Sequence, residues 1–222
     1  MSSSSLSVSA DQSPGPVTGD DVAQAVDVAV AALRPAVDAD WDVPAGSLEW
    51  TCWETGEHLA DDLFWYAAHI GTLREKTEGD LPFGYASRRP QGPANTVTAD
   101  RDAGPLALFE VMEACGGILA AVVRATPPTA RGHHVYGVSD PEGFAAMGIV
   151  ETLLHAHDIA LGVGVDFEAP ADLCARVLHR LFPDAPDDAA PWPALLWVSG
   201  RGDLPGRERV GKWRWYGAPR AT

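Results

Sequence analysis

The chain has 222 residues, and its 31 acidic and 16 basic side chains leave a formal net charge of −15 at pH 7. A surface this acidic repels a phosphate backbone, so nucleic acid is excluded as an expected partner. Hydrophobic residues make up 46% of the chain, enough for a sizeable core in one domain with appendages. No run of about eighteen apolar residues is present, so no membrane span and no membrane partner are expected.

The amino-terminal segment, residues 1–19, is rich in Ser, Pro and Gly. It lacks the basic and apolar regions of a signal peptide, so we expect a disordered tail. The three cysteines, Cys52, Cys115 and Cys174, are odd in number and far apart in sequence. We expect reduced, buried thiols, which fits a cytoplasmic location better than a secreted one.

Apolar residues recur at helical spacing in four long segments and one short one. Thr18 is a plausible N-cap for the first helix, and Thr51 with Glu54 has the form of a capping box at the start of the second. The fourth opens with a proline, a residue favoured in the first turn. The predicted helices span residues 20–37, 51–74, 104–124, 141–161 and 170–182.

Two segments fall outside this pattern. Residues 75–103 are rich in Gly, Pro and charge, and so long a connection is expected where it covers a site or spans a bundle. Near the carboxyl end, residues 194–200 fit a last helical turn or a strand, and residues 209–217 fit a strand or an extended arm. The pattern predicts an all-α protein: a four-helix bundle (20–165), then a short fifth helix and a small C-terminal extension with an arm (166–222).

The polar residues in the fourth predicted helix are candidates for a metal site. Glu151 and His155 lie one helical turn apart on one face, and Asp158 shares that face. A carboxylate oxygen and an imidazole nitrogen supply two ligands to one ion. The best third donor is His58 of the second predicted helix, because facing helices bring such side chains together in a bundle. Two histidines and one carboxylate leave coordination positions open for water or substrate.

Zinc suits this set of donors, and nickel, iron, manganese or cobalt are alternatives. A metal-free, hydrogen-bonded core is the alternative reading, because Glu and His one turn apart also occur on ordinary helices. His134, just before the fourth helix, is a candidate catalytic acid or base or else part of an exposed polar loop. His157 points about 100° away from His155 and is expected to pack or to support a ligand. Asp62 and His69 are expected to support the site by hydrogen bonds.

Two motifs in order resemble one known family. The segment "WTCWETGEHLADDLFWY" on the second helix and "ETLLHAHD" on the fourth are similar to the DinB-like superfamily, in particular the N-terminal domain of mycothiol-dependent maleylpyruvate isomerase. The resemblance covers about residues 20–164. It implies that His58, Glu151 and His155 hold the metal and that Asp158 is the acid that follows the ligands. It also implies a DinB-like bundle, with mycothiol, a thiol of actinobacteria, as co-substrate.

The resemblance ends with the bundle. The isomerase adds an α/β domain that contributes basic residues near the site. Residues 166–222 are too few to form such a domain, so maleylpyruvate is not the expected substrate. Five basic side chains in this segment either meet an anion or form a solvated face: Arg201, Arg207, Arg209, Lys212 and Arg214.

These observations predict a thiol-dependent S-transferase or isomerase with Asp158 and His134 as catalytic residues. A small electrophile or a thiol would be its partner, and the assembly is either a monomer or a homodimer. A metal-dependent hydrolase and a non-enzymatic binding or stress-response bundle are the alternatives.

Overall fold

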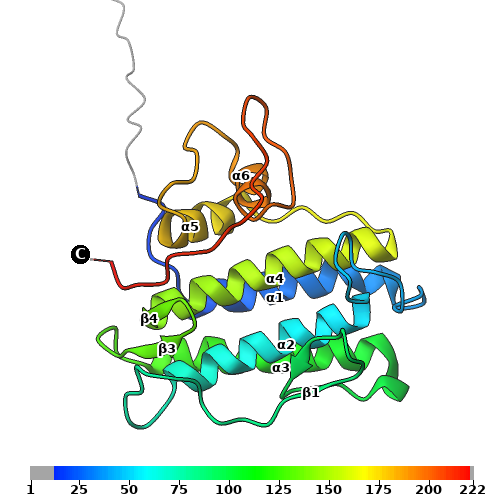
Figure 1. Ribbon diagram of the computed structural model, residues 1–222, viewed down its shortest axis with the longest axis horizontal. Coiled ribbons are helices and arrows are strands. Elements are labelled where there is room, and N and C mark those ends of the chain that lie inside the picture. The colour runs from blue at the N-terminus through cyan, green and yellow to red at the C-terminus, as the bar shows by residue number, and fades with distance from the viewer. Residues whose placement is uncertain (1–12, 221–222) are drawn as a thin grey trace, which may run out of the picture.

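The all-α prediction is confirmed by a computed structural model, which describes residues 13–220. About half of the chain is helical. The described residues form six helices, as labelled in Figure 1: α1 (Gly19–Leu33), α2 (Cys52–Ile70), α3 (Gly104–Ala125), α4 (Pro141–Val163), α5 (Ala171–Leu181) and α6 (Pro191–Val198). The predicted tail lies mostly outside the described residues. At its end, Val17 is buried and Thr18 caps α1.

The first four helices lie side by side along the long axis and enclose the core, with α1 and α4 on one side and α2 and α3 on the other (Figure 1). Helix α4 is apolar on nearly every face, as expected of a helix that packs inside a bundle. Gly148 of α4 permits close packing, because a Cβ there would lie 2.5 Å from Leu119 Cδ2. Polar side chains on α4 therefore project into the interior of the protein.

The helix ends follow local chemistry. Thr18 and Asp21 form a capping box at α1, and Thr51 and Glu54 form one at α2. The prediction extended the first two helices too far. Pro35 turns the end of α1 into a single 3-10 turn, and α2 stops at Gly71, both residues that interrupt helical geometry.

The long connection between α2 and α3 is fastened to α2. It contains a two-residue antiparallel pair, β1 (Ala86–Ser87) and β2 (Ala94–Asn95). Arg88 makes a two-pronged ion pair with Glu57, at 2.6 and 2.7 Å. These contacts hold the connection along one face of α2. The segment before α4, predicted as a loop, forms a short hairpin of β3 (Gly132–His134) and β4 (Gly137–Ser139).

The carboxyl-terminal segment packs on the α4 side of the bundle (Figure 1). Residues 194–200 belong mostly to α6, and residues 209–217, which we name the arm, form no strand within the described part of the chain. The buried Arg180 of α5 pairs with Asp140 at 2.8 Å. By length and composition alone α3 and α4 could each cross a membrane, but 83% of the apolar window of α4 is buried inside the protein, as expected of a core helix.

Candidate metal centre

Four polar side chains meet between α2 and α4. His58, Asp62 and His155 each offer a ligand atom, and these atoms lie within 4.8 Å of one another. The imidazole rings of His58 and His155 have centroids 5.6 Å apart. Glu151, one turn before His155, places Oε2 3.2 Å from His155 Nε2. The fold thus brings His58 and His155 together, as predicted. Asp62, expected mainly as a support, completes the group within 4.8 Å, whereas the predicted ligand Glu151 lies beside His155 and is not part of that group.

Both imidazoles, His58 and His155, face this group with their Nε2 atoms. His58 Nε2 lies 3.3 Å from Asp62 Oδ2, and His155 Nε2 faces Glu151. His58 Nδ1 lies 3.4 Å from the side-chain oxygen of Asn95. When Nδ1 donates its proton to that oxygen, Nε2 keeps the lone pair that a metal requires.

The far side of His155 faces a second acid. His155 Nδ1 lies 3.4 Å from Asp158 Oδ2, without a well-directed hydrogen bond. Arg201, which follows α6, grips Asp158 with three hydrogen bonds of 2.8–3.1 Å. An imidazole with one nitrogen toward the metal and the other toward a carboxylate is the usual arrangement of a histidine ligand. Asp158 is 2% exposed and lies behind His155.

Burial and crowding shift the pKa values of these groups. Burial and the charge of His155 lower the pKa of His58 to about 4. Burial opposes protonation of His155 too, but the adjacent carboxylates of Asp158 and Glu151 stabilise its charged ring, outweigh the burial and raise its pKa to about 9. Burial and the neighbouring Glu151 raise the pKa of Asp62 well above its usual value. A divalent cation would offset this crowding of carboxylates, so the donor set fits a metal.

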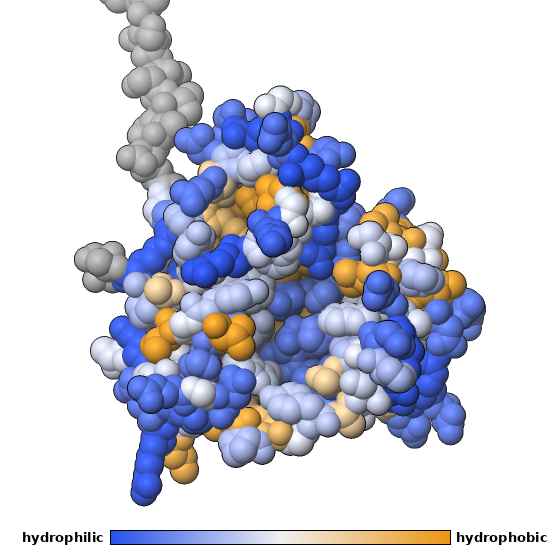
Figure 2. All heavy atoms as spheres, in the orientation of Figure 1, coloured by the Kyte–Doolittle hydropathy of each residue, from blue (hydrophilic) through white to orange (hydrophobic). Residues whose placement is uncertain are grey.

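The group is open to solvent on one side. The side chains of His58, Asp62 and Glu151 keep 24%, 18% and 14% of their surface exposed. Figure 2 shows a hollow with a hydrophilic floor on the same face, between the carboxyl-terminal elements and the α2 side of the bundle. This access suits a reactive site better than a sealed structural one.

Two residues at the site, Tyr66 and Asn95, escaped the sequence analysis, and a third, Arg201, was expected only as one of five basic residues that meet an anion or form a solvated face. Tyr66, which fits the apolar stripe of α2, donates its hydroxyl proton to Glu151 Oε1 over 3.4 Å. Asn95 comes from the long connection and Arg201 from the segment after α6. Tyr66 was overlooked because it fits the apolar stripe of α2, whereas no local sequence pattern marks Asn95 or Arg201.

His134 lies at the end of this group and not in an exposed loop. It is 5% exposed, and its ring centroid is 5.9 Å from that of Tyr66 and 5.8 Å from that of Trp215. Its Nδ1 accepts a hydrogen bond from the Tyr136 backbone N–H, which leaves the proton of the neutral ring on Nε2. Burial lowers the pKa of His134 to about 4. His134 is therefore a neutral hydrogen-bond donor at neutral pH.

The other candidate side chains serve the fold. His157 packs against Trp192 of α6 with ring centroids 5.5 Å apart. His69 donates from Nδ1 to the Trp65 carbonyl and accepts at Nε2 from the Leu81 N–H, which ties α2 to the connection. Neither residue belongs to the group that could hold a metal.

The cysteines supply no nucleophile. All three are free and buried, as expected from the sequence. Burial raises the pKa of the Cys52 and Cys115 thiols to about 11 and that of Cys174 to about 12. Any thiolate that reacts at this site at neutral pH would have to come from outside the chain.

Comparison with known families adds the observation that decides the relationship. Residues 22–160, which contain nearly all of the four bundle helices and the group that could hold a metal, match the profile described as the mycothiol maleylpyruvate isomerase N-terminal domain. The chain belongs to this family. No curated protein and no solved structure gives a significant match.

Membership of the mycothiol maleylpyruvate isomerase N-terminal domain family confirms the predicted DinB-like relationship. The match ends at residue 160, so it includes His58, Asp62, Glu151, His155 and Asp158 but not Arg201. The contact between Arg201 and Asp158 is therefore supplied by a part of the chain that the family does not describe.

Proposed function

We propose that the protein is a divalent-metal-dependent enzyme that uses a low-molecular-weight thiol, mycothiol, to transfer sulfur to a small electrophile or to isomerise it. The observation that carries this proposal is the solvent-accessible group of His58, Asp62 and His155, with Glu151 beside it, in a chain of this family. We also propose a cytoplasmic location, because mycothiol, the proposed co-substrate, is an intracellular thiol.

His58, Glu151 and His155 would hold the metal, and zinc is the ion we favour. Asp62 supplies a further carboxylate within reach of the same position. Because the pKa of His155 is raised to about 9, metal binding at neutral pH must release a proton from this ring. Asp158 and Arg201 then keep His155 in its orientation from behind.

When bound, a divalent ion would lower the pKa of a coordinated thiol so that the thiolate predominates at neutral pH. His134 would donate a hydrogen bond from Nε2 to an oxygen of the electrophile, because its Nδ1 is already occupied by the Tyr136 N–H. Tyr66 keeps Glu151 in place through its hydroxyl. The surrounding aromatic rings exclude water from His134.

The proposed transfer balances without an oxidant or a reductant. The thiolate sulfur forms a bond to carbon, and the leaving group departs with the electron pair of the bond that breaks. In the isomerase form, the thiolate adds to an activated double bond, rotation follows about the resulting single bond, and the thiolate leaves again. The chain's own residues move no electrons and only hold or donate protons.

Metal content and turnover test the proposal on protein purified without a histidine tag. We expect about one equivalent of divalent metal by elemental mass spectrometry. His155→Ala should remove it, and the matched variant His157→Ala should retain it because His157 packs on Trp192 outside the site. Mycothiol with 1-chloro-2,4-dinitrobenzene should release chloride at a rate that falls with the metal content.

Two outcomes would overturn the proposal. A protein that folds but binds no divalent metal would exclude both metal-dependent chemistries and leave a binding bundle. A metal-loaded protein that hydrolyses esters or amides without thiol, and shows no thiol-dependent turnover, would support a hydrolase, in which metal-bound water is the nucleophile.

A further inference from the structure

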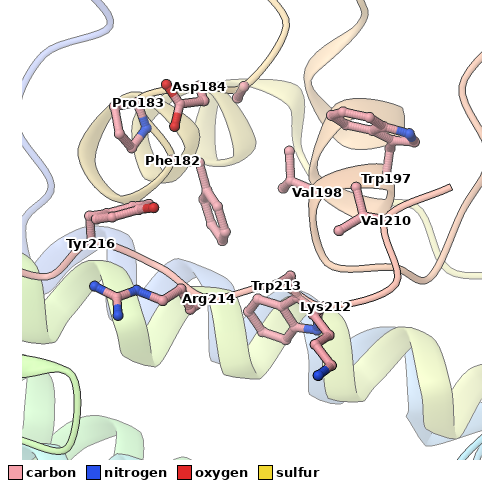
Figure 3. Close-up of a pocket in the computed structure, with 11 residues that line it drawn as sticks. Phe182, Pro183, Asp184, Trp197, Val198, Val210, Lys212, Trp213, Arg214 and Tyr216 are labelled. Carbon is pink, nitrogen blue, oxygen red and sulfur yellow. The ribbon is translucent and has the colours of Figure 1, made fainter. Parts of the chain in front are cut away.

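A second cavity lies outside the bundle, between α5, α6 and the arm. Its volume is about 410 Å³, within the size range of small-molecule sites. In Figure 3, Phe182 and Tyr216 form one side of the cavity, Trp197, Val198 and Val210 form the other, and Trp213 lies between the two sides. We call this cavity the arm pocket. None of its residues belongs to the part of the chain that matches the family.

The walls of the arm pocket suit a flat apolar ring. Phe182 and Trp213 have ring centroids 6.3 Å apart, and the indoles of Trp197 and Trp213 both line the cavity. These indoles are half-buried, so part of their surface is open to a ligand. Figure 2 shows exposed hydrophobic atoms over α5 and α6. Aromatic rings favour offset or edge-on contacts with another ring at this spacing.

The charged residues around the arm pocket indicate which polar group the ligand carries beside its ring. Of the five basic residues singled out in the sequence, three form ion pairs: Arg201 with Asp158, Arg207 with Asp188 and Arg209 with Asp203. The other two, Lys212 and Arg214, line the cavity and pair with no acid among residues 13–220. In a chain of net charge −15, two such cations at one cavity are an unusual local feature. Their charged ends diverge: Arg214 extends toward Tyr216 and Lys212 extends away from it (Figure 3).

Lys212 and Arg214 extend from the arm on the α4 side of the cavity, whereas Asp184 lies at the opposite edge (Figure 3). The guanidinium of Arg214 is held over the ring of Tyr216 at 5.0 Å and over that of Tyr136 at 5.7 Å. This support fixes its position without neutralising its charge. An anion that enters from the α4 side would meet one of these cations and lie away from Asp184.

We infer that the arm pocket binds a small aromatic carboxylate, with its ring among Phe182, Trp197 and Trp213 and its carboxylate at Lys212 or Arg214. A molecule of one or two rings fits the volume of the cavity. The charged groups supply charge-assisted hydrogen bonds, which discriminate an acid from its neutral amide. The inference does not rest on the proposed function, because the arm pocket contains none of the metal-binding residues.

The test uses 1-naphthylacetate and its uncharged analogue 1-naphthylacetamide, titrated into the full-length protein by isothermal titration calorimetry. The acid should bind at least about tenfold more tightly than the amide. The double variant Lys212→Gln/Arg214→Gln should lose this preference while it binds the amide unchanged. Both substituted side chains are exposed, so the variant is expected to fold normally.

The matched control is Arg74→Gln/Arg209→Gln, which changes the net charge by the same amount at exposed positions that do not line the cavity. It should leave the affinity for 1-naphthylacetate unchanged. Val210→Trp, which fills the cavity, should weaken both ligands about tenfold or more. If that variant does not fold, the cation variants alone still decide the result.

Chelated protein separates this site from the metal centre. Binding of 1-naphthylacetate should persist after treatment with EDTA. Loss of binding on chelation, equal affinity for acid and amide, or equal weakening in the two double variants would each overturn the inference. Absence of binding at millimolar concentration would do the same.

Discussion

Arg201 is the residue whose effect on the metal centre is easiest to isolate. It contacts no proposed ligand, yet its guanidinium holds Asp158 behind His155. Outer partners of this kind typically change metal affinity by about 10–100-fold. We expect Arg201→Ala to weaken zinc binding about tenfold or more, as measured by competition with a chromophoric chelator. The zinc affinity of Arg201→Lys should lie between those of the wild type and Arg201→Ala, because lysine keeps the charge but loses the two-pronged contact.

Arg209→Ala is the control for this prediction, because Arg209 lies in the same segment and pairs only with the exposed Asp203. The circular dichroism spectrum of each apoprotein shows whether the fold is retained. Equal zinc affinity in a folded Arg201→Ala protein would mean that the contact with Asp158 serves the fold alone.

His134 makes a prediction about acid stability. Burial lowers its pKa from 6.5 to about 4, and the charges around it are Glu151 of α4, His69 of α2, His133 of β3 and Asp80 of the connection. The unfolded chain therefore binds a proton between pH 6.5 and 4 that the folded chain does not, so stability falls as pH falls through this window. The shift corresponds to about 3 kcal/mol at most.

Chelated protein and its His134→Gln variant should be unfolded with urea across this range of pH. The free energy of unfolding of the wild type should decrease more steeply between pH 6.5 and 4 than that of the variant, which has no titrating ring at this position. Parallel curves for the two proteins would show that His134 is not the buried neutral group described above.

The candidate metal ligands could be found in the sequence because each stands out in its local helical pattern. Glu151 and His155 are one turn apart on an apolar helix, and His58 interrupts another apolar helix. Asn95 and Arg201 carry no such signal. Each reaches its partner across a long separation in sequence, so only the packing of the connection and of the carboxyl-terminal segment brings it there.

At the level of elements, helical periodicity predicted the four bundle helices and α5, and errors are concentrated at the ends. Pro35 and Gly71 end α1 and α2 earlier than the apolar pattern does. The β3–β4 hairpin was missed because Gly132–Ser139 contains few residues of strong strand preference and only three pairs of backbone contacts. The choice between helix and strand for α6 could not be made from eight residues, since both fit a short apolar run.

The connection between α2 and α3 is a functional element if Asn95 orients His58. Arg88 fastens it by its contacts with Glu57 and with the Ala99 carbonyl. Arg88→Gln leaves the buried Glu57 carboxylate with the Ala99 N–H alone, which should destabilise the protein by about 1–3 kcal/mol. We expect faster amide hydrogen exchange across residues 84–99 and weaker zinc binding, with α3 and α4 still protected.

Arg74→Gln is the matched control, because Arg74 is an exposed arginine near the start of the same connection. It should change neither measurement. Faster exchange across residues 84–99 without any loss of zinc affinity in Arg88→Gln would separate the connection from the metal centre and remove Asn95 from its proposed role.

On the scale of the whole molecule, the metal would join elements that are otherwise linked by packing and by a few polar contacts, such as that of Tyr66 with Glu151. His58 and Asp62 come from α2, Glu151 and His155 from α4, and Arg201 ties the carboxyl-terminal segment to the same place. An ion that binds the folded chain and not the unfolded one at 100 times its Kd adds about 2.7 kcal/mol of stability. For a chain of this length, that corresponds to a rise in Tm of about 5–10 °C.

Differential scanning calorimetry of chelated protein, with and without zinc, measures this coupling. His58→Ala should abolish the rise in Tm, since it removes the only imidazole that α2 contributes to the group. His157→Ala should keep the rise, because the ring packs on α6 and faces away from the ion. The arm pocket should be insensitive to zinc, so 1-naphthylacetate should raise Tm by the same increment in His58→Ala as in wild type. A zinc-dependent rise that survives in His58→Ala would place the ion elsewhere and would contradict the assignment of α2 and α4 as its joint support.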